Sequence, residues 1–296
     1  MPNVDVNMSD LDVEPIQHPR SSPLWETLAD GLSFDFEACM KRSIEPGYRS
    51  GWRTLPIDIL TCEHRGPIEL ALADGRRIIC QRGEGLCIPA YVTHETLSLR
   101  TTPGVSTWTT GLFRIWGTVA LLSLFETPCI LPCSAARRVG LLSEELRITA
   151  KRPRGLGQAL AIRSIGIALA AVIADSVPAS PAFGALVSGA GRMRPILEYI
   201  GEHLTTVTIE ELANRFCLSP RRLHALFDAT MSTSPGRYLQ SLRIHQARRL
   251  LVTTSLSVQE IGERSGYADA FHFSRQFKTC CGMSPRAYRT SGETRL

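Results

Sequence analysis

The chain has 296 residues, 44% of them hydrophobic, so it can bury a full core, and its length favours two domains. Its formal charge of +5 is uneven: residues 192–296 carry 15 Lys and Arg against 9 Asp and Glu, a net of +6, and residues 1–191 carry 18 against 19. The acidic start at residues 1–12 lacks the basic and apolar run of an export signal, which argues against secretion. We therefore expect a cytoplasmic protein whose nine cysteines are free thiols.

Residues 1–20 are polar and contain proline, so we expect a flexible tail there. Residues 21–134 are rich in short apolar runs separated by turn residues, a pattern typical of strands. The predicted strands are residues 57–60, 68–70, 77–80, 86–88, 96–99 and 108–113. Asp74 and Gly75 predict a hairpin turn, because both residue types suit its backbone angles. Strands of this length and spacing predict a small barrel or sandwich.

The pattern becomes helical at residues 135–176, where apolar residues fall near helical spacing. A Pro-Arg-Gly sequence at residues 153–155 divides this segment into two helices. The most apolar stretch, residues 156–174, is interrupted by Gln, Arg and Ser, so we expect a packed helix and no membrane span. Residues 177–191 are rich in Ser, Pro, Ala and Gly and predict a linker, followed by a helical domain at residues 192–296.

The helical domain contains the same pattern twice. Residues 209–213 correspond to residues 258–262, and each run follows a predicted N-cap, Thr208 or Ser257, with a glutamate three residues after it. Five more residues recur fifty positions later in identity or class. These pairs are Leu223 and Phe273, Phe227 and Phe277, Ser234 and Ser284, Pro235 and Pro285, and Tyr238 and Tyr288. A repeated helix-turn-helix unit predicts DNA binding, and the positive charge of this region agrees with it.

In such a unit, the N-terminal residues of the second helix lie in the major groove. Ser219 and Pro220 predict the start of that helix in the first unit, and Ala268 and Asp269 predict it in the second. The residues expected to face DNA are Arg221, Arg222, His224, Ala225, Ala270, His272, Ser274, Arg275 and Lys278.

The basic residues of this set have different expected roles. Arg221 and Arg275 are the candidates for reading a base, because one guanidinium can bond both O6 and N7 of guanine. Arg222 and Lys278 are expected to hold phosphate, which sets the register on the duplex.

A helix is expected between the two units, at residues 235–253, with Arg243, Arg248 and Arg249 on its outer face. Its residues, at about 1.5 Å each, give a rod of roughly 30 Å. Successive major-groove faces are roughly 34 Å apart, so one chain could contact two consecutive turns of DNA.

Three stretches of the second unit resemble the AraC/XylS family of bacterial transcriptional regulators. They are residues 261–269 (Ile-Gly-Glu-Arg-Ser-Gly-Tyr-Ala-Asp), 273–278 (Phe-Ser-Arg-Gln-Phe-Lys) and 282–289 (Gly-Met-Ser-Pro-Arg-Ala-Tyr-Arg). The resemblance covers about a hundred residues, a third of the chain. The first unit is a looser match and departs at Ser232, where many members have a glycine, so the chain could leave the first recognition helix in a stiffer or differently angled way.

The resemblance implies an α+β protein of two domains: a cupin-like β-barrel sensor at residues 21–134 with dimerisation helices at residues 135–176, and an all-α double helix-turn-helix domain. Gly83, Pro89 and His94 have the spacing of the second cupin motif, although Tyr91 replaces its glycine. No His-x-His pair precedes them, so we expect neither a metal site nor a cofactor. The candidate residues of an effector pocket are Trp52, His94 and Trp108.

Together these features predict a sequence-specific regulator, with activation as the more usual outcome in relatives. We expect it to bind double-stranded promoter DNA as a homodimer and to contact RNA polymerase there. We also expect it to respond to a small effector, and we expect no catalytic residues and no membrane partner. Three alternatives stay open. One is a cupin oxygenase or thiol-dependent enzyme, for which Cys129 with Cys133, or Cys280 with Cys281, could be cited. The others are a scaffold without specific DNA recognition and a constitutive regulator without an effector.

Overall fold

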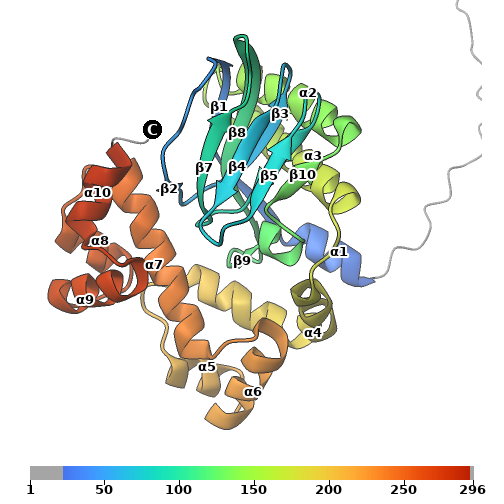
Figure 1. Ribbon diagram of the computed structural model, residues 1–296. Helices are drawn as coiled ribbons and strands as arrows, with labels where there is room; N and C mark the ends of the chain where they lie inside the picture. Colours follow the sequence, from blue (N-terminus) through green and yellow to red (C-terminus); the bar gives the residue numbers. More distant parts are fainter. Residues whose placement is uncertain (1–22, 294–296) are drawn as a thin grey trace, which may run out of the picture.

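The computed structural model describes residues 23–293, and the tail predicted at residues 1–20 lies outside this range. Figure 1 shows a β-rich domain, coloured blue to green, beside a group of helices coloured orange to red. The helix α4, Pro181–Glu202, lies between the two groups. The predicted order, a sheet domain followed by a helical domain, is confirmed.

Within residues 23–293, ten strands form two antiparallel sheets. The strands are β1 Leu32–Ile44, β2 Arg53–Thr54, β3 Asp58–Glu63, β4 Ile68–Leu72, β5 Arg77–Cys80, β6 Gly85–Ile88, β7 Thr93–Ser98, β8 Gly104–Ile115, β9 Val119–Ala120 and β10 Cys129–Leu131. One sheet has the order β1-β8-β3-β6-β10, with β9 paired to β8, and the other has the order β2-β7-β4-β5. Every predicted strand is present, as is the hairpin turn between β4 and β5, where Gly75 has φ +90°. The long strand β1 and the short strands β2, β9 and β10 were not predicted.

The two sheets enclose an apolar core because alternate residues of each strand face the partner sheet. Ile59 of β3 packs in one cluster with Ile68 and Leu70 of β4, and all three are almost fully buried. Its neighbour Leu60 belongs to a second cluster, on the opposite face of the larger sheet. That face must therefore be covered by other elements.

Helices α2, Cys133–Thr149, and α3, Leu156–Ser176, contact each other and cover this outer face. The break predicted at residues 153–155 is confirmed, since α2 ends before it and α3 begins directly after it. Helix α3 is long and apolar enough to cross a membrane. One face of it packs against the rest of the sheet domain, with Leu169 and Ile173 fully buried, and 28% of its most apolar window is buried in all. A short helix α1, Pro23–Asp30, and a 3₁₀ turn η2, Leu121–Leu124, complete the domain.

The linker predicted at residues 177–191 is wrong. The structure has helix α4 from Pro181, with Ser180 as the N-cap residue and the proline at the first helical position, a common start for a helix. The small residues that suggested flexibility instead permit close packing. A Cβ on Gly189 would lie 2.5 Å from Oγ1 of Thr230 in the helical domain, so only glycine fits there.

The helical domain contains six helices. They are α5 Ile209–Arg215, α6 Pro220–Met231, α7 Pro235–Thr253, α8 Val258–Arg264, α9 Ala270–Cys281 and α10 Pro285–Glu293. The core of the first unit, which includes Leu223 and Phe227, is continuous through α4 with the core of the sheet domain. The second unit has a separate core around Phe273, Phe277 and Tyr288. The first unit is therefore joined to the sheet domain by packing, whereas the second is attached mainly through α7.

Candidate nucleic-acid interface

The first helix-turn-helix unit consists of α5 and α6, and both helices begin at the predicted residues. The Thr208 hydroxyl accepts a hydrogen bond of 3.1 Å from the Glu211 amide at the start of α5. The Ser219 hydroxyl accepts one of 3.3 Å from the Arg222 amide at the start of α6, and Pro220 occupies the first helical position. These caps satisfy amide groups that have no partner inside the helix.

The second unit, α8 and α9, repeats this arrangement. Ser257 and Glu260 form a reciprocal capping box, with bonds of 3.2 Å from the Glu260 amide and 2.8 Å from the Ser257 amide. Asp269 caps α9 by accepting from the amides of Phe271 and His272, at 3.1 and 2.8 Å. Both amide bonds lower the pKa of the Asp269 carboxyl, so it stays ionised at a helix end that favours negative charge.

Both recognition helices end in a residue with left-handed backbone angles. Gly282 follows α9 with φ +73°, and Ser232 follows α6 with φ 49° and ψ 35°. The first helix therefore ends in the same way as the second although it lacks the glycine, so the differently angled exit considered from the sequence is absent. The serine Cβ makes this conformation less favourable at Ser232 than at Gly282.

The structure exposes the predicted DNA-facing residues at the N-terminal halves of α6 and α9. Seven of the nine are exposed: Arg221, Arg222, His224, Ala225, His272, Arg275 and Lys278. Ala270 and Ser274 are half-buried. The opposite faces of both helices are apolar and fully buried at Leu223, Phe227, Phe273 and Phe277. Each helix thus packs by one face and presents basic groups on the other.

Sequence reasoning missed Phe271, the second residue of α9. Its side chain is 81% exposed on the N-terminal turn of the helix, between Ala270 and His272. An aromatic ring in this position can contact the C5 methyl group of thymine in the major groove. The signal was available, because Phe271 precedes the core residue Phe273 by two positions and cannot share its face of the helix.

The comparison with known proteins gives the same reading of this region. A family model described as a helix-turn-helix domain matches residues 212–291. The arabinose operon regulatory protein of Escherichia coli K12 is 36% identical over 107 residues, which are 36% of this chain and 37% of that protein. The transcriptional activator RhaS of Escherichia fergusonii is 36% identical over 106 residues, which are 36% of this chain and 38% of that protein.

The chain is similar in its helix-turn-helix region to the arabinose operon regulatory protein and to RhaS. It spans little more than a third of the length of these relatives. Among solved structures, the C-terminal domain of the response regulator yesN of Fusobacterium nucleatum is 30% identical, with a TM-score of 0.33 over 33% of this chain and 98% of that one. Unsaturated fatty acid bound ToxT of Vibrio cholerae is 14% identical, with a TM-score of 0.48 over 87% of this chain and 95% of that one.

Helix α7 joins the two units. The prediction that its arginines lie free in solvent is wrong. Arg243 donates to the carbonyls of Leu204 and Val207, at 2.9 and 2.8 Å, and so fixes the loop between α4 and α5. Arg248 and Arg249 face the sheet domain. The sequence pattern of α7 could not show this, because the sheet domain covers a face of the helix that would otherwise be polar surface.

Tyr91 connects the sheet domain to α7 through several contacts. Its ring stacks on His245 with centroids 3.9 Å apart, and its hydroxyl donates to the His245 carbonyl at 3.1 Å. The Arg248 guanidinium lies 4.1 Å from the ring centroid and donates to the Tyr288 hydroxyl at 3.1 Å. Tyr91 has φ 68°, so a strained backbone position is retained where its side chain contacts α7.

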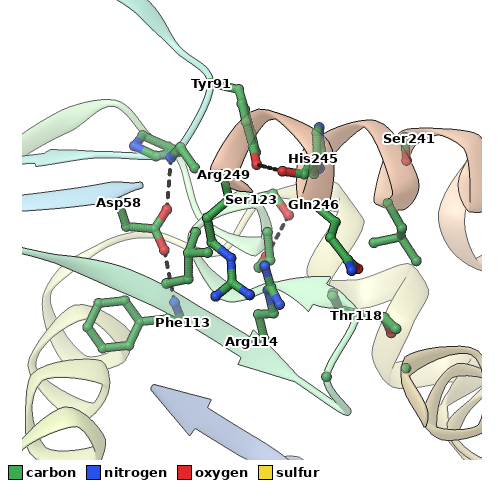
Figure 2. A pocket seen from close by; sticks show the side chains of 18 of the residues that line it. Asp58, Tyr91, Phe113, Arg114, Thr118, Ser123, Ser241, His245, Gln246 and Arg249 are labelled. Atoms are coloured by element: carbon green, nitrogen blue, oxygen red, sulfur yellow. Dashed lines mark hydrogen bonds between the residues drawn. The ribbon is translucent and has the colours of Figure 1, made fainter. Parts of the chain in front are cut away.

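A cavity of about 410 Å³ lies beside this contact, between the sheet domain and α7. Figure 2 shows Arg114 of β8 and Arg249 of α7 extending into the same space. Both guanidiniums lie 3.8 Å from the half-exposed Asp35 carboxylate. Much of the remaining lining is apolar and includes Leu112, Val119, Leu204, Met231 and Leu242.

Asp58 also lines the cavity, but its charge is already engaged. Its two oxygens accept hydrogen bonds from the amides of Ala90 at 2.8 Å and Phe113 at 3.0 Å. Burial raises the pKa of Asp58 to about 6, although the two amide bonds oppose that shift. The buried His245 beside it is neutral at pH 7, since desolvation lowers its pKa to about 4. The two arginines are therefore the cationic side chains of the cavity, and the carboxylates of Asp35 and Asp58 carry the opposite charge.

The three predicted effector residues lie around β2 and β7. His94 pairs with Arg53 of β2, and the Arg53 guanidinium lies 5.4 Å from the Trp108 ring. Trp52 is half-exposed before β2. Desolvation lowers the pKa of His94 to about 4, and its Nδ1 lies 2.8 Å from the Val92 carbonyl. Nε2 of His94 and Nε1 of Trp108 are buried and have no hydrogen-bond partner among residues 23–293.

The part of the chain that the structure describes contains no group of three or more His, Cys, Asp or Glu side chains placed to hold a metal ion. The nine cysteines are all free, as predicted. Cys280 and Cys281 are adjacent in α9, so their side chains project in different directions.

Proposed function

We propose that this protein is a sequence-specific, double-stranded-DNA-binding transcriptional regulator of the cytoplasm, without enzymatic activity. The observation that carries the proposal is the pair of capped helices, α6 and α9, which α7 connects and which present Arg221 and Arg275 outward. We propose that these two helices enter successive major grooves of one duplex. Relatives include RhaS, which is named a transcriptional activator, and this favours activation through RNA polymerase.

The basic residues divide the work of recognition. Arg221, in the first turn of α6, and Arg275, near the middle of α9, bond guanine in the groove. Arg222 and Lys278 bind phosphate and set the register. The other predicted DNA-facing residues fill the space against the bases. These are the exposed His224, Ala225 and His272 and the half-buried Ala270 and Ser274.

A salt titration of DNA affinity tests this assignment. Log affinity should fall with log salt at a slope of about −0.9 for each phosphate contact, and Lys278→Ala should reduce that slope by about 1. Arg275→Ala should cost about 1 to 3 kcal/mol on the preferred site and much less on random duplex. A flat salt response would exclude DNA binding, and equal losses on both duplexes would refute the division between Arg275 and Lys278.

Two copies associate through α2 and α3. These helices cover the sheet with one face and leave large apolar side chains on the other: Leu141, Ile148, Leu156, Leu160 and Ile167. A row of this kind on a soluble domain marks an interaction surface. A symmetric dimer would bury it and would place two DNA-binding domains on one operator.

The interdomain cavity supports an effector with an anionic head and an apolar body. Arg114 belongs to the sheet domain and Arg249 to α7, and both lie near the carboxylate of Asp35. A ligand carboxylate that took the place of Asp35 between the two guanidiniums would tie the two domains together. Such a ligand favours whichever domain arrangement brings the two guanidiniums close, which is the condition for shifting an equilibrium between two states. A second candidate site lies at Trp52, His94 and Trp108, because two buried nitrogen atoms there have no partner among residues 23–293.

Binding of octanoate, decanoate and palmitate, each compared with its matching alcohol, separates these possibilities. A ligand in the interdomain cavity should bind as the carboxylate and not as the alcohol. Arg249→Ala should weaken its binding at least about tenfold, which is about 1.4 kcal/mol. Trp108→Phe should leave its affinity unchanged. Arg237→Ala is the matched control, since Arg237 is exposed on the same helix away from the cavity. Loss with Trp108→Phe alone would move the effector to the second site. Equal binding of acid and alcohol would exclude the arginine pair, and DNA affinity unchanged by any bound probe would favour a constitutive regulator.

A further inference from the structure

Two of the nine thiols lie directly opposite each other in the sheet domain. Strand β10 pairs antiparallel with β6, and the register places Cys129 against Cys87. Residues directly opposite in an antiparallel pair project their side chains from the same face of the sheet. The two sulfur atoms are therefore neighbours. The sequence could not show this, because 41 residues separate the two cysteines along the chain.

The backbone spacing of such a pair suits a disulfide. Directly opposite residues have Cα atoms about 4.5 to 5.5 Å apart, and disulfides span about 4.4 to 6.8 Å between Cα atoms. The corresponding Cβ spacing of about 4.5 to 5.5 Å has to shorten only slightly to reach the roughly 3.5 to 4.5 Å of a disulfide. No rearrangement of the sheet is needed.

The two thiols differ in a way that gives them separate roles. Cys87 is fully buried in the core under α2, whereas Cys129 is partly exposed on the edge strand β10. The neighbouring Cys87 thiol lowers the pKa of Cys129, whereas the Cys129 sulfur and burial raise the pKa of Cys87. Cys129 is therefore the thiol that an oxidant reaches and the one that ionises more easily.

We propose that Cys87 and Cys129 are a redox-active pair that hydrogen peroxide converts into an intramolecular disulfide. The Cys129 thiolate attacks one peroxide oxygen, the O–O bond breaks, and Cys129 becomes a sulfenic acid as hydroxide leaves and takes up a proton. The Cys87 sulfur then attacks the sulfenic sulfur and forms the S–S bond, while the S–O bond breaks and the hydroxide leaves with the proton of the Cys87 thiol as water. Overall, two thiols lose two hydrogen atoms and one peroxide is reduced to two waters.

The disulfide would act on the connection between the two domains. Pro132 alone separates β10 from α2. The segment before β10 is hydrogen-bonded to the residues that precede α4: the Glu126 amide donates to the Pro178 carbonyl, and the Ser180 amide donates to the Leu124 carbonyl. A link from Cys129 to Cys87 would fasten this segment to the sheet. Since a cytoplasmic thiol pair is normally kept reduced, the link would form transiently under oxidation.

Mass spectrometry of the full chain tests the proposal. The purified protein is treated with a small excess of hydrogen peroxide, quenched with catalase, alkylated with N-ethylmaleimide in denaturant and digested without reductant. The expected product is a linked pair of peptides that contain Cys87 and Cys129, two hydrogen atoms lighter than their sum and separated by dithiothreitol. It should persist in Cys133→Ser and Cys280→Ser, which change exposed thiols, and be absent in Cys129→Ser.

Thermal unfolding supplies a second readout. Peroxide should raise the melting temperature of the wild type, with reversal by dithiothreitol, because the link removes freedom from the unfolded chain. Cys129→Ser should show no such rise, and this variant replaces the partly exposed residue, so its folding does not depend on filling the core at Cys87. Maleimide on both Cys87 and Cys129 after oxidation, or a dominant link to any other cysteine, would overturn the proposal.

Discussion

Removing the Tyr91 side chain should loosen the sheet domain from α7. In Tyr91→Ala the chain loses the stack on His245, the hydroxyl bond to the His245 carbonyl and the contact with the Arg248 guanidinium. These contribute about 0.5 to 1.5 kcal/mol, about 0.5 to 1.5 kcal/mol and about 0.5 to 1 kcal/mol respectively. We expect a loss of about 2 to 3 kcal/mol in the free energy of unfolding.

The backbone of Tyr91 separates the side-chain contribution from the strain. Its φ of 68° costs a residue with a Cβ about 1 to 2 kcal/mol, and glycine avoids most of that cost. Tyr91→Gly should therefore be about 1 kcal/mol more stable than Tyr91→Ala, although it lacks the same contacts. Tyr91→Phe should lose only the hydroxyl bond, about 1 kcal/mol.

Urea unfolding of these variants, combined in a double-mutant cycle with Arg248→Ala, measures the contact itself. Arg248 also bonds Tyr288, and the cycle subtracts that contribution. The expected coupling between Tyr91 and Arg248 is about 0.5 to 1 kcal/mol. A coupling of zero would show that the contact does not form in solution. A glycine variant no more stable than the alanine variant would show that the backbone is unstrained.

Three further outcomes follow from the same structure. Ser232→Gly should raise the free energy of unfolding by about 0.5 to 1 kcal/mol, because Ser232 ends α6 with left-handed backbone angles that favour glycine. Urea unfolding measures this, and a lower midpoint than that of the wild type would contradict it. Phe277→Ala should lower the free energy of unfolding by about 3 to 5 kcal/mol and unfold the second unit. Amides in α8 to α10 should then lose hydrogen-exchange protection while those of the sheet domain keep it. Unchanged protection would mean that Phe277 does not belong to the core. Leu160→Asp should convert the proposed dimer to a monomer in analytical sedimentation. Ile79→Asp is the control, because it changes an exposed apolar residue of β5 and should leave the dimer intact. A dimer that survives Leu160→Asp would place the interface elsewhere.

The helix-turn-helix units could be predicted nearly to the residue because their signals are local. A helix start needs only a capping side chain and the amides two or three residues after it, so Thr208, Ser219, Ser257 and Asp269 are recognisable in the sequence. The two repeats also supported each other. Which residues face the core then follows from helical spacing, and the exposure of Arg221 and Arg275 agrees with it.

The errors arose where packing between distant segments decides the structure. Residues 177–191 have the composition of a linker, yet the close contact of Gly189 with Thr230 makes small residues a requirement of the interface between α4 and α6. Pro181 after Ser180 was a local signal for a helix start, and it was outweighed by composition. Arg248 and Arg249 were assigned to solvent because the sequence does not show that the sheet domain docks on α7.

The sheet domain was predictable in kind but not in detail. Runs such as β3 and β4 are buried and apolar, and they were found. Strand β1 was missed because half of its length is exposed and carries charged residues, so its pairing with β8 stabilises it more than its own pattern does. The opposition of Cys87 and Cys129 depends on strand register, which no local signal in the sequence specifies.

Selection of bound duplexes from a random library tests the central claim most directly, with the full chain as wild type, Arg221→Ala and Arg275→Ala. The account predicts that the wild type enriches a site with two recognised elements about one helical turn apart, preferred over random DNA by about a thousandfold or more. Each variant should lose the preference at one base pair, in a different element for each arginine. No enriched sequence, or the same site enriched by all three proteins, would contradict it.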